Sequence, residues 1–225
     1  MRQLILHIGP GKSGSSALQS WLALNQDALA RLGYAFHVSD PGARHFRINS
    51  GNAGALRTML DHAVFPASEF ERTYFRDQPN AIVSGEQLQL LDKTLAEPLL
   101  RWAAQESVDV TVMGVLRNAY DYLYSTWLQT IKRRNQVKPF ASFVQRLSRF
   151  RHLDVVDHWE TLATSHWIHY DSARDCLAQA FCARTGLDAS ALSQMSPRRV
   201  NRGLTPEEAD LLPVSYTHLR AHETN

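Results

Sequence analysis

The residues best suited to chemistry lie near the start of the chain, where the segment 7–16, HIGPGKSGSS, gathers glycines, hydroxyls and one lysine. Before it, residues 4–8 form a nearly unbroken apolar run, which is typical of a parallel strand buried on both faces. After it, apolar residues recur at helical spacing from Leu18 to Leu32. A turn from strand to helix points backbone N–H groups and the positive end of the helix dipole at one place. The segment is therefore expected to bind phosphate or sulfate.

The motif that binds nucleoside triphosphates, G-x-x-x-x-G-K-[ST], does not match this segment. Gly11, Lys12 and Ser13 supply its end, but its leading glycine falls on Leu6, inside the strand. Residues 12–16, KSGSS, instead resemble the loop that holds the 5′-phosphosulfate in sulfotransferases using 3′-phosphoadenosine-5′-phosphosulfate (PAPS). Short loops of this composition also occur as ordinary turns. The resemblance implies that the donor is held by Gly11, Lys12, Ser13, Gly14, Ser15 and Ser16.

A second segment of this kind follows the apolar run 110–116, which also reads as a buried strand. Arg117 stands at its end, and Ser125 follows eight positions later in a predicted helix. This pair resembles the site of the same family that holds the 3′-phosphate of the donor. A guanidinium group suits phosphate because its donors form a planar fork. The alternative is that Arg117 is a surface ion-pair partner and Ser125 an incidental helix residue.

The chemistry of sulfuryl transfer requires a cation and a base near the donor. Negative charge develops on the bridging oxygen of the leaving phosphate, and Lys12 is the cation expected to stabilise it. A base must take the proton of the acceptor, and Glu86, just past the strand-like run 81–84, resembles the glutamate of several sulfotransferase groups. Partial burial would have to raise the pKa of Glu86 to make it efficient. Alternatively, Glu86 only favours the dipole of a helix first turn.

Three further residues extend the predicted site. His45 is the second choice for the base, because a histidine serves in the cytosolic members of the family. Arg199 and Arg202 occupy a late loop that the family often brings over the donor phosphate, although a plain solvated loop is an equal alternative. His7, on the first strand, is expected to be packed and hydrogen-bonded rather than reactive.

Length and pattern predict a single α/β domain. The chain has 225 residues, of which 44% are hydrophobic, and no linker divides it. Its strand-like and helix-like runs alternate, which indicates three layers: a parallel central sheet with helices on both faces, as in the sulfotransferase fold that resembles P-loop NTPases. Residues 1–212 are expected to form this domain. Residues 213–225 look like translated read-through of a sequencing adaptor and are expected to be a non-native tail.

Expected strands lie at 3–8, 34–37, 81–84, 110–116 and 167–170. Expected helices lie at 16–32, 98–104, 120–133, 140–150 and 176–184. The stretch 38–66 is expected to be irregular and to form part of an acceptor pocket or a lid.

Charge and hydropathy limit the kinds of partner and the cellular location that we expect. A net charge of +2 does not favour nucleic acid. No apolar run reaches the length of a membrane span, and the first strand leaves no room for a signal peptide, so a cytoplasmic location is expected. The pattern implies no metal, and it leaves the oligomeric state open.

The resemblance implies a PAPS-dependent sulfotransferase that acts on a hydroxyl or amine acceptor, with a carbohydrate or glycolipid preferred on the resemblance alone. Two alternatives stay open. One is a nucleotide-dependent kinase of related fold, in which the strand-like run 167–170 ends at a magnesium-binding Asp171. The other is a module that binds adenosine bisphosphate or a sulfated glycan without turnover.

Overall fold

Parallel strands form the centre of the molecule. The computed structural model describes residues 1–9, 11–45, 51–134, 139–147 and 151–196. Within these residues, five parallel strands form one sheet in the order β2-β3-β1-β4-β5. The strands are β1 (Arg2–Ile8), β2 (Tyr34–Ala35), β3 (Asn80–Ser84), β4 (Val108–Leu116) and β5 (Thr164–His169).

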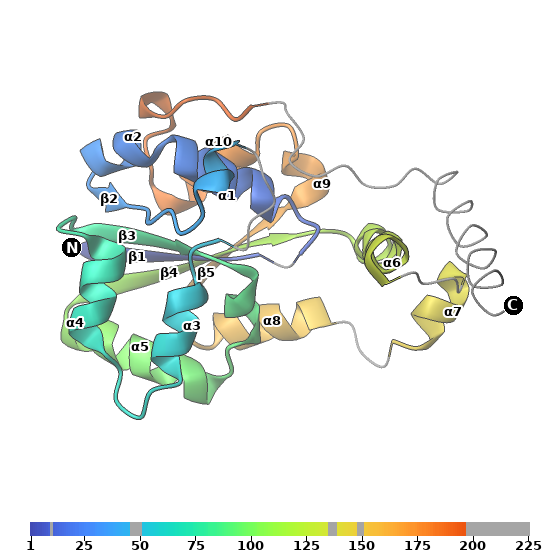
Figure 1. Cartoon of the computed structure of the whole chain (residues 1–225), viewed down its shortest axis with the longest axis horizontal. Coiled ribbons are helices and arrows are strands. Elements are labelled where there is room, and N and C mark those ends of the chain that lie inside the picture. The colour runs from blue at the N-terminus through green and yellow to red at the C-terminus, as the bar shows by residue number, and fades with distance from the viewer. Residues whose placement is uncertain (10, 46–50, 135–138, 148–150, 197–225) are drawn as a thin grey trace, which may run out of the picture.

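Helices cover both faces of this sheet, which confirms the predicted three-layer α/β architecture (Figure 1). One face carries α1 (Ser15–Leu24), α2 (Gln26–Arg31), α9 (Tyr170–Ala173) and α10 (Leu177–Thr185). The other face carries α3 (Gly54–Leu60), α4 (Ala67–Phe70), α5 (Lys93–Gln105) and α8 (Arg151–Glu160). Beyond the carboxyl ends of the strands lie α6 (Ala119–Arg134) and α7 (Phe140–Gln145). Shorter turns are the 3₁₀ helices η1 (Pro41–His45), η3 (Glu86–Leu90) and η4 (Ala189–Ala191), and the π-helix η2 (Glu71–Phe75).

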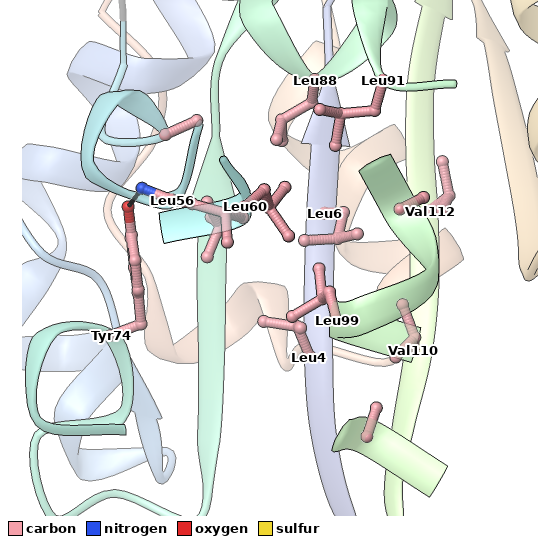
Figure 2. Packing of buried hydrophobic residues seen from close by; sticks show 14 of the residues in the cluster. Leu4, Leu6, Leu56, Leu60, Tyr74, Leu88, Leu91, Leu99, Val110 and Val112 are labelled. Atoms are coloured by element: carbon pink, nitrogen blue, oxygen red, sulfur yellow. Dashed lines mark hydrogen bonds between the residues drawn. The ribbon is translucent and has the colours of Figure 1, made fainter. Parts of the chain in front are cut away.

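The central strand β1 is buried on both faces, as its apolar run predicts. Leu4 and Leu6 are fully buried and pack with Leu99 of α5 on one face (Figure 2). Ile5 points to the opposite face, where it packs with residues of α1 and α10, among them Leu18. Each such side chain contributes about 1.5–3 kcal/mol by leaving water. The strand that precedes the 7–16 segment is therefore a rigid support.

The helix predicted over 16–32 is wrong in one respect, because the chain divides it into α1 and α2 at Asn25. The Asn25 side chain accepts hydrogen bonds from the backbone N–H and the hydroxyl of Ser193, at 2.8 and 2.9 Å. These contacts join residues 168 positions apart, so local periodicity could not reveal them. The predicted helix end is confirmed, since Gly33 adopts a φ of 80°.

The helix predicted over 98–104 begins earlier, at Lys93, so that prediction is wrong at its start. The carboxylate of Asp92 accepts a hydrogen bond from the backbone N–H of Leu95 at 2.9 Å and caps the helix. Pro98 therefore lies inside α5 rather than at its first position, where proline is usually favoured.

Other boundaries also differ from the prediction. The stretch 38–66 contains α3, whose Leu56 and Leu60 are buried in the core, so it is not irregular throughout. The predicted helix over 140–150 ends at Gln145 as α7, and α8 was not predicted. The fifth strand begins earlier than expected, and Tyr170 opens α9 instead of ending the strand.

Tyr74 fixes α3 to the rest of this face. Its hydroxyl accepts from the backbone N–H of Leu56 at 2.8 Å (Figure 2) and donates to the carbonyl of Asn52, also at 2.8 Å. Burial raises the pKa of Tyr74 to about 12. The ring therefore remains neutral and hydrogen-bonded at any pH at which the protein is studied.

Along the described ranges, no helix is both long enough and apolar enough to cross a bilayer. The predicted tail, 213–225, lies outside the described residues.

Candidate functional site

The predicted site residues follow three neighbouring strands. The loop that contains Lys12 follows β1, Glu86 follows β3, and Arg117 follows β4. Since β1 pairs with β3 on one side and with β4 on the other, all in parallel, their carboxyl ends meet at one edge of the sheet. Ligands of open α/β sheets bind at such an edge, beside the strand where the order reverses.

The loop after β1 has a tightly restricted backbone. A Cβ on Gly9 would lie 2.1 Å from the Ser15 hydroxyl oxygen, so only glycine fits there. Gly14 has a φ of 81° and precedes α1 directly, and Lys12 has a φ of 70°. Lysine rarely occupies this left-handed region, and conformations of this kind concentrate at functional sites. The backbone therefore turns sharply and presents the start of α1 to the edge of the sheet.

Two buried hydroxyl groups of this loop are without a hydrogen-bond partner in the part of the chain that the structure describes. Ser13 is fully buried and Ser15 nearly so, yet neither hydroxyl has a hydrogen-bond partner within the described part of the chain. Gly14, which caps α1, has no side chain to satisfy the first N–H groups of the helix. A buried polar group without a partner costs about 1–3 kcal/mol. These donors fit an anion.

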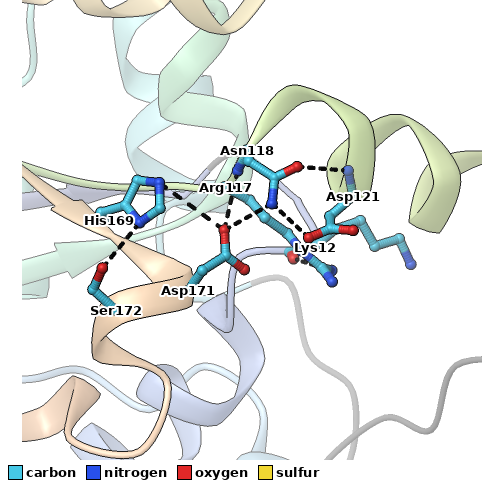
Figure 3. Close-up of polar contacts among 7 residues, drawn as sticks. All are labelled: Lys12, Arg117, Asn118, Asp121, His169, Asp171 and Ser172. Carbon is cyan, nitrogen blue, oxygen red and sulfur yellow. Dashed lines mark hydrogen bonds and ion pairs between the residues drawn. The ribbon is translucent and has the colours of Figure 1, made fainter.

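Arg117 joins the second motif to this loop. Its Nη1 donates to the carbonyl oxygen of Lys12 at 3.3 Å, and Figure 3 shows both side chains in one cluster. Its Nε is buried and has no partner among the residues that the structure describes. One edge of the guanidinium thus holds the loop, while a second donor is still to be satisfied. The two predicted phosphate motifs therefore lie together.

Glu86 lies against the opposite side of the loop. Its carboxylate oxygens are 3.3 and 3.5 Å from the position that a Cβ on Gly11 would occupy. Glu86 is the first residue of η3, and it is exposed, so the protein itself does not provide the expected partial burial. Both sequence interpretations of this residue agree with its position: it opens a helical turn, and it adjoins the loop.

The remaining predicted residues lie on α1, α6 and η1 or outside the described residues. Ser16 is half-buried in the first turn of α1, and Ser125 is half-buried on α6. His45 lies at the exposed end of η1, and no hydrogen bond or ion pair within the described residues connects it to the loop. Arg199 and Arg202 lie outside the described residues.

A buried polar network that the sequence did not predict lies beneath the site. His7 Nδ1 and the Ser84 hydroxyl oxygen are 2.7 Å apart, and the Gln19 amide donates to the same oxygen at 3.1 Å. The Asn52 side chain accepts the backbone N–H of Ser84 at 2.7 Å. All four side chains are buried. The network ties the end of β3, two residues before Glu86, to the end of β1.

His7 itself is packed and hydrogen-bonded, as the sequence indicated. Burial lowers the pKa of His7 to about 4. The unfolded chain takes up a proton near pH 6.5 and the folded chain only near pH 4, so stability is complete above about pH 6.5 and is lost as the pH falls toward 4. Over this window the loss should reach about 3 kcal/mol.

Denaturant unfolding at several pH values checks this expectation. His7→Gln keeps a polar side chain beside Ser84 but cannot titrate, so its free energy of unfolding should vary with pH by about 3 kcal/mol less than that of the wild type. His62→Gln, at an exposed histidine, is the matched control and should follow the wild type. Parallel curves for the wild type and His7→Gln would contradict the assignment.

Comparisons with known proteins complete the description. No protein-family model matches the chain, and no curated protein sequence matches it. The chain is similar to the crystal structure of a sulfotransferase from Alicyclobacillus acidocaldarius, with a TM-score of 0.52 and 12% identity over 97% of this chain and 92% of that one. Retinol dehydratase in complex with androsterone and the inactive cofactor PAP gives a TM-score of 0.42 at 13% identity, over 96% of this chain and 65% of that one. Mouse sulfotransferase SULT7A1 complexed with PAP gives 0.44 at 14% identity, over 96% and 65%.

Proposed function

Since the chain has the sulfotransferase fold, we propose that it is a sulfotransferase that moves a sulfuryl group from PAPS to a hydroxyl or amine acceptor. The observation that carries the proposal is the hydrogen bond from Arg117 to the Lys12 carbonyl. It brings together two anion-binding motifs, each with buried donors that lack a partner in the described chain. A donor with phosphate groups on the 3′ and 5′ positions of its ribose would satisfy both.

In our proposal, each of the two motifs binds one phosphate group of the donor. Ser13, Ser15 and the start of α1 are suited to the 5′-phosphosulfate, because their donors gather at one helix end. Arg117 is suited to the 3′-phosphate, and in our proposal the Ser125 hydroxyl of α6 is a second donor to it. Arg199 and Arg202 complete this binding in our proposal, as the resemblance implies.

The reaction forms a bond between the acceptor oxygen and sulfur and breaks the bond between sulfur and the bridging oxygen of the phosphate. The electron pair stays on the bridging oxygen, where the Lys12 ammonium stabilises it. The acceptor proton passes to Glu86, whose carboxylate adjoins the loop at Gly11. A bound acceptor covers Glu86 and removes it from water, which strengthens it as a base. A carbohydrate or glycolipid hydroxyl is the acceptor that we propose.

Calorimetry tests the choice of donor. Adenosine 3′,5′-bisphosphate (PAP) should bind, and ATP with magnesium should not. Arg117→Ala should lower the affinity for PAP by about 10- to 100-fold, because a hydrogen-bonded charge pair with phosphate is lost. Arg101→Ala, at an exposed arginine of α5, is the control and should bind as the wild type does.

The other results of this experiment identify the alternatives. Preferential binding of ATP with magnesium would favour the kinase. Binding of PAP without transfer of labelled sulfate from PAPS to any of a panel of sugars, glycolipids and amines would favour a module without turnover.

A further inference from the structure

The short helix α9, which follows β5, contacts both predicted motifs. Asp171 bonds Asn118 (Figure 3), and the ring of Tyr170 lies against Gly14. The first two residues of α9, Tyr170 and Asp171, face the two residues that link β4 to α6, Arg117 and Asn118. Tyr170 contacts Arg117, and Asp171 contacts Asn118. The sequence offered Asp171 only as a magnesium ligand in the kinase alternative.

One carboxylate oxygen of Asp171 holds Asn118 at two points. It accepts the backbone N–H of Asn118 at 3.3 Å and the side-chain amide of Asn118 at 3.0 Å. The side-chain oxygen of Asn118 accepts a hydrogen bond from the backbone N–H of Asp121 at 2.9 Å and so caps the start of α6. The same amide also donates to the carboxylate of Asp121 at 2.5 Å. Asp171 and Asp121 together therefore fix Asn118, and only Asp171 also holds the backbone of the chain just after Arg117.

Tyr170 supports the same arrangement from the side of the loop. The carbon atom at the centre of the Arg117 guanidinium lies 5.5 Å from the centre of the Tyr170 ring, within the range of a cation–π contact. The same ring lies so close to Gly14 that a Cβ there would be 2.8 Å from it. Arg117 is thus held between this ring and the carbonyl of Lys12.

We propose that Asp171 is a positioning residue for the 3′-phosphate: by holding Asn118, it sets where Arg117 and the start of α6 meet that phosphate. This inference rests on the proposed function. The effect is confined to one end of the donor, because the contacts of Asp171 lead to the link before α6 and to His169, whose Nε2 is 4.0 Å away.

The charge state of Asp171 agrees with this role. Desolvation raises its pKa, but hydrogen bonds from Asn118 and the charges of Arg117 and His169 together hold the pKa below its ordinary value. The group is therefore an ionised acceptor near neutral pH.

The test compares two ligands that differ only in the 3′-phosphate, PAP and adenosine 5′-monophosphate (AMP). The ratio of their dissociation constants, measured by calorimetry, reports how well the protein uses that phosphate. Asp171→Ala should reduce the preference for PAP by about tenfold and leave the affinity for AMP unchanged. Asp171→Asn should retain the preference to within a few-fold, because its amide oxygen can accept the same N–H groups. Asp175→Ala removes an exposed carboxylate just after α9 and should behave as the wild type does.

A second variant keeps the test decisive if Asp171→Ala does not fold. Asn118→Ser retains a side-chain oxygen to cap α6 but loses the amide donor to Asp171, and it should show a smaller loss of the same kind.

The results separate the two proposals. If the wild type binds PAP no better than AMP, the proposed function is wrong, and so is this inference. A wild type that prefers PAP, together with Asp171→Ala or Asn118→Ser variants that keep the full preference, overturns this inference alone. An equal loss of PAP and AMP affinity also overturns it, because it indicates general damage to the fold.

Discussion

Replacing Lys12 by methionine should lower turnover of PAPS by about 10² to 10³. The ammonium group is placed by a loop in which other atoms pack closely around the neighbouring glycines. The Lys12 carbonyl is also held by a hydrogen bond from Arg117. Methionine keeps much of the length of the side chain but not its charge. Because the charge matters most when the phosphate leaves, kcat should fall more than the affinity for PAP.

Steady-state transfer of labelled sulfate, combined with calorimetry of PAP, measures both quantities. Lys93→Met is the matched control, since it removes an exposed lysine at the start of α5, and it should keep wild-type turnover. A Lys12→Met enzyme with the turnover of the Lys93→Met enzyme would show that the leaving group needs no cation from this loop.

Glu86→Gln should lower kcat by about 10² to 10⁴, because glutamine has the shape of glutamate but cannot take a proton. The affinity for PAP should change little, since in our proposal Glu86 acts on the acceptor and is not one of the residues that hold the donor. Single-turnover transfer to an identified acceptor measures the chemical step, and calorimetry measures donor binding.

The control for this variant is Glu97→Gln, at an exposed glutamate of α5 that pairs only with Arg101 within the described structure. If Glu86→Gln retains nearly full turnover, the base is another residue, and His45→Ala is the next variant to measure.

The parts of the fold that follow from local sequence were predictable. The strand before the loop and the strand before Arg117 are apolar runs buried on both faces, so composition alone indicates them. The loop itself was predictable because glycine and hydroxyl residues have local backbone roles. The predicted parallel sheet also placed both motifs at the carboxyl ends of strands, but that these two strands are neighbours, so that Lys12 and Arg117 meet, is known only from the structure.

The rest depends on contacts between distant parts of the chain. Asn25 divides the first helix because it bonds Ser193, and Asn118 bonds Asp171, 53 positions away. Neither contact leaves a periodic signal in the sequence. The exposure of Glu86 is of the same kind, because burial depends on which segments fold over a residue. One signal was available locally: asparagine three positions before Asp121 is a typical helix-capping pattern.

The left-handed backbone of Lys12 carries a thermodynamic consequence. A residue with a Cβ is held in that region at a cost of about 1–2 kcal/mol, whereas glycine adopts it freely. The sequence with the greatest stability in this loop is therefore not the one that the chain has. With the catalytic role that we propose for Lys12, stability and activity oppose each other at this position, and selection for heat-resistant variants alone should remove the lysine.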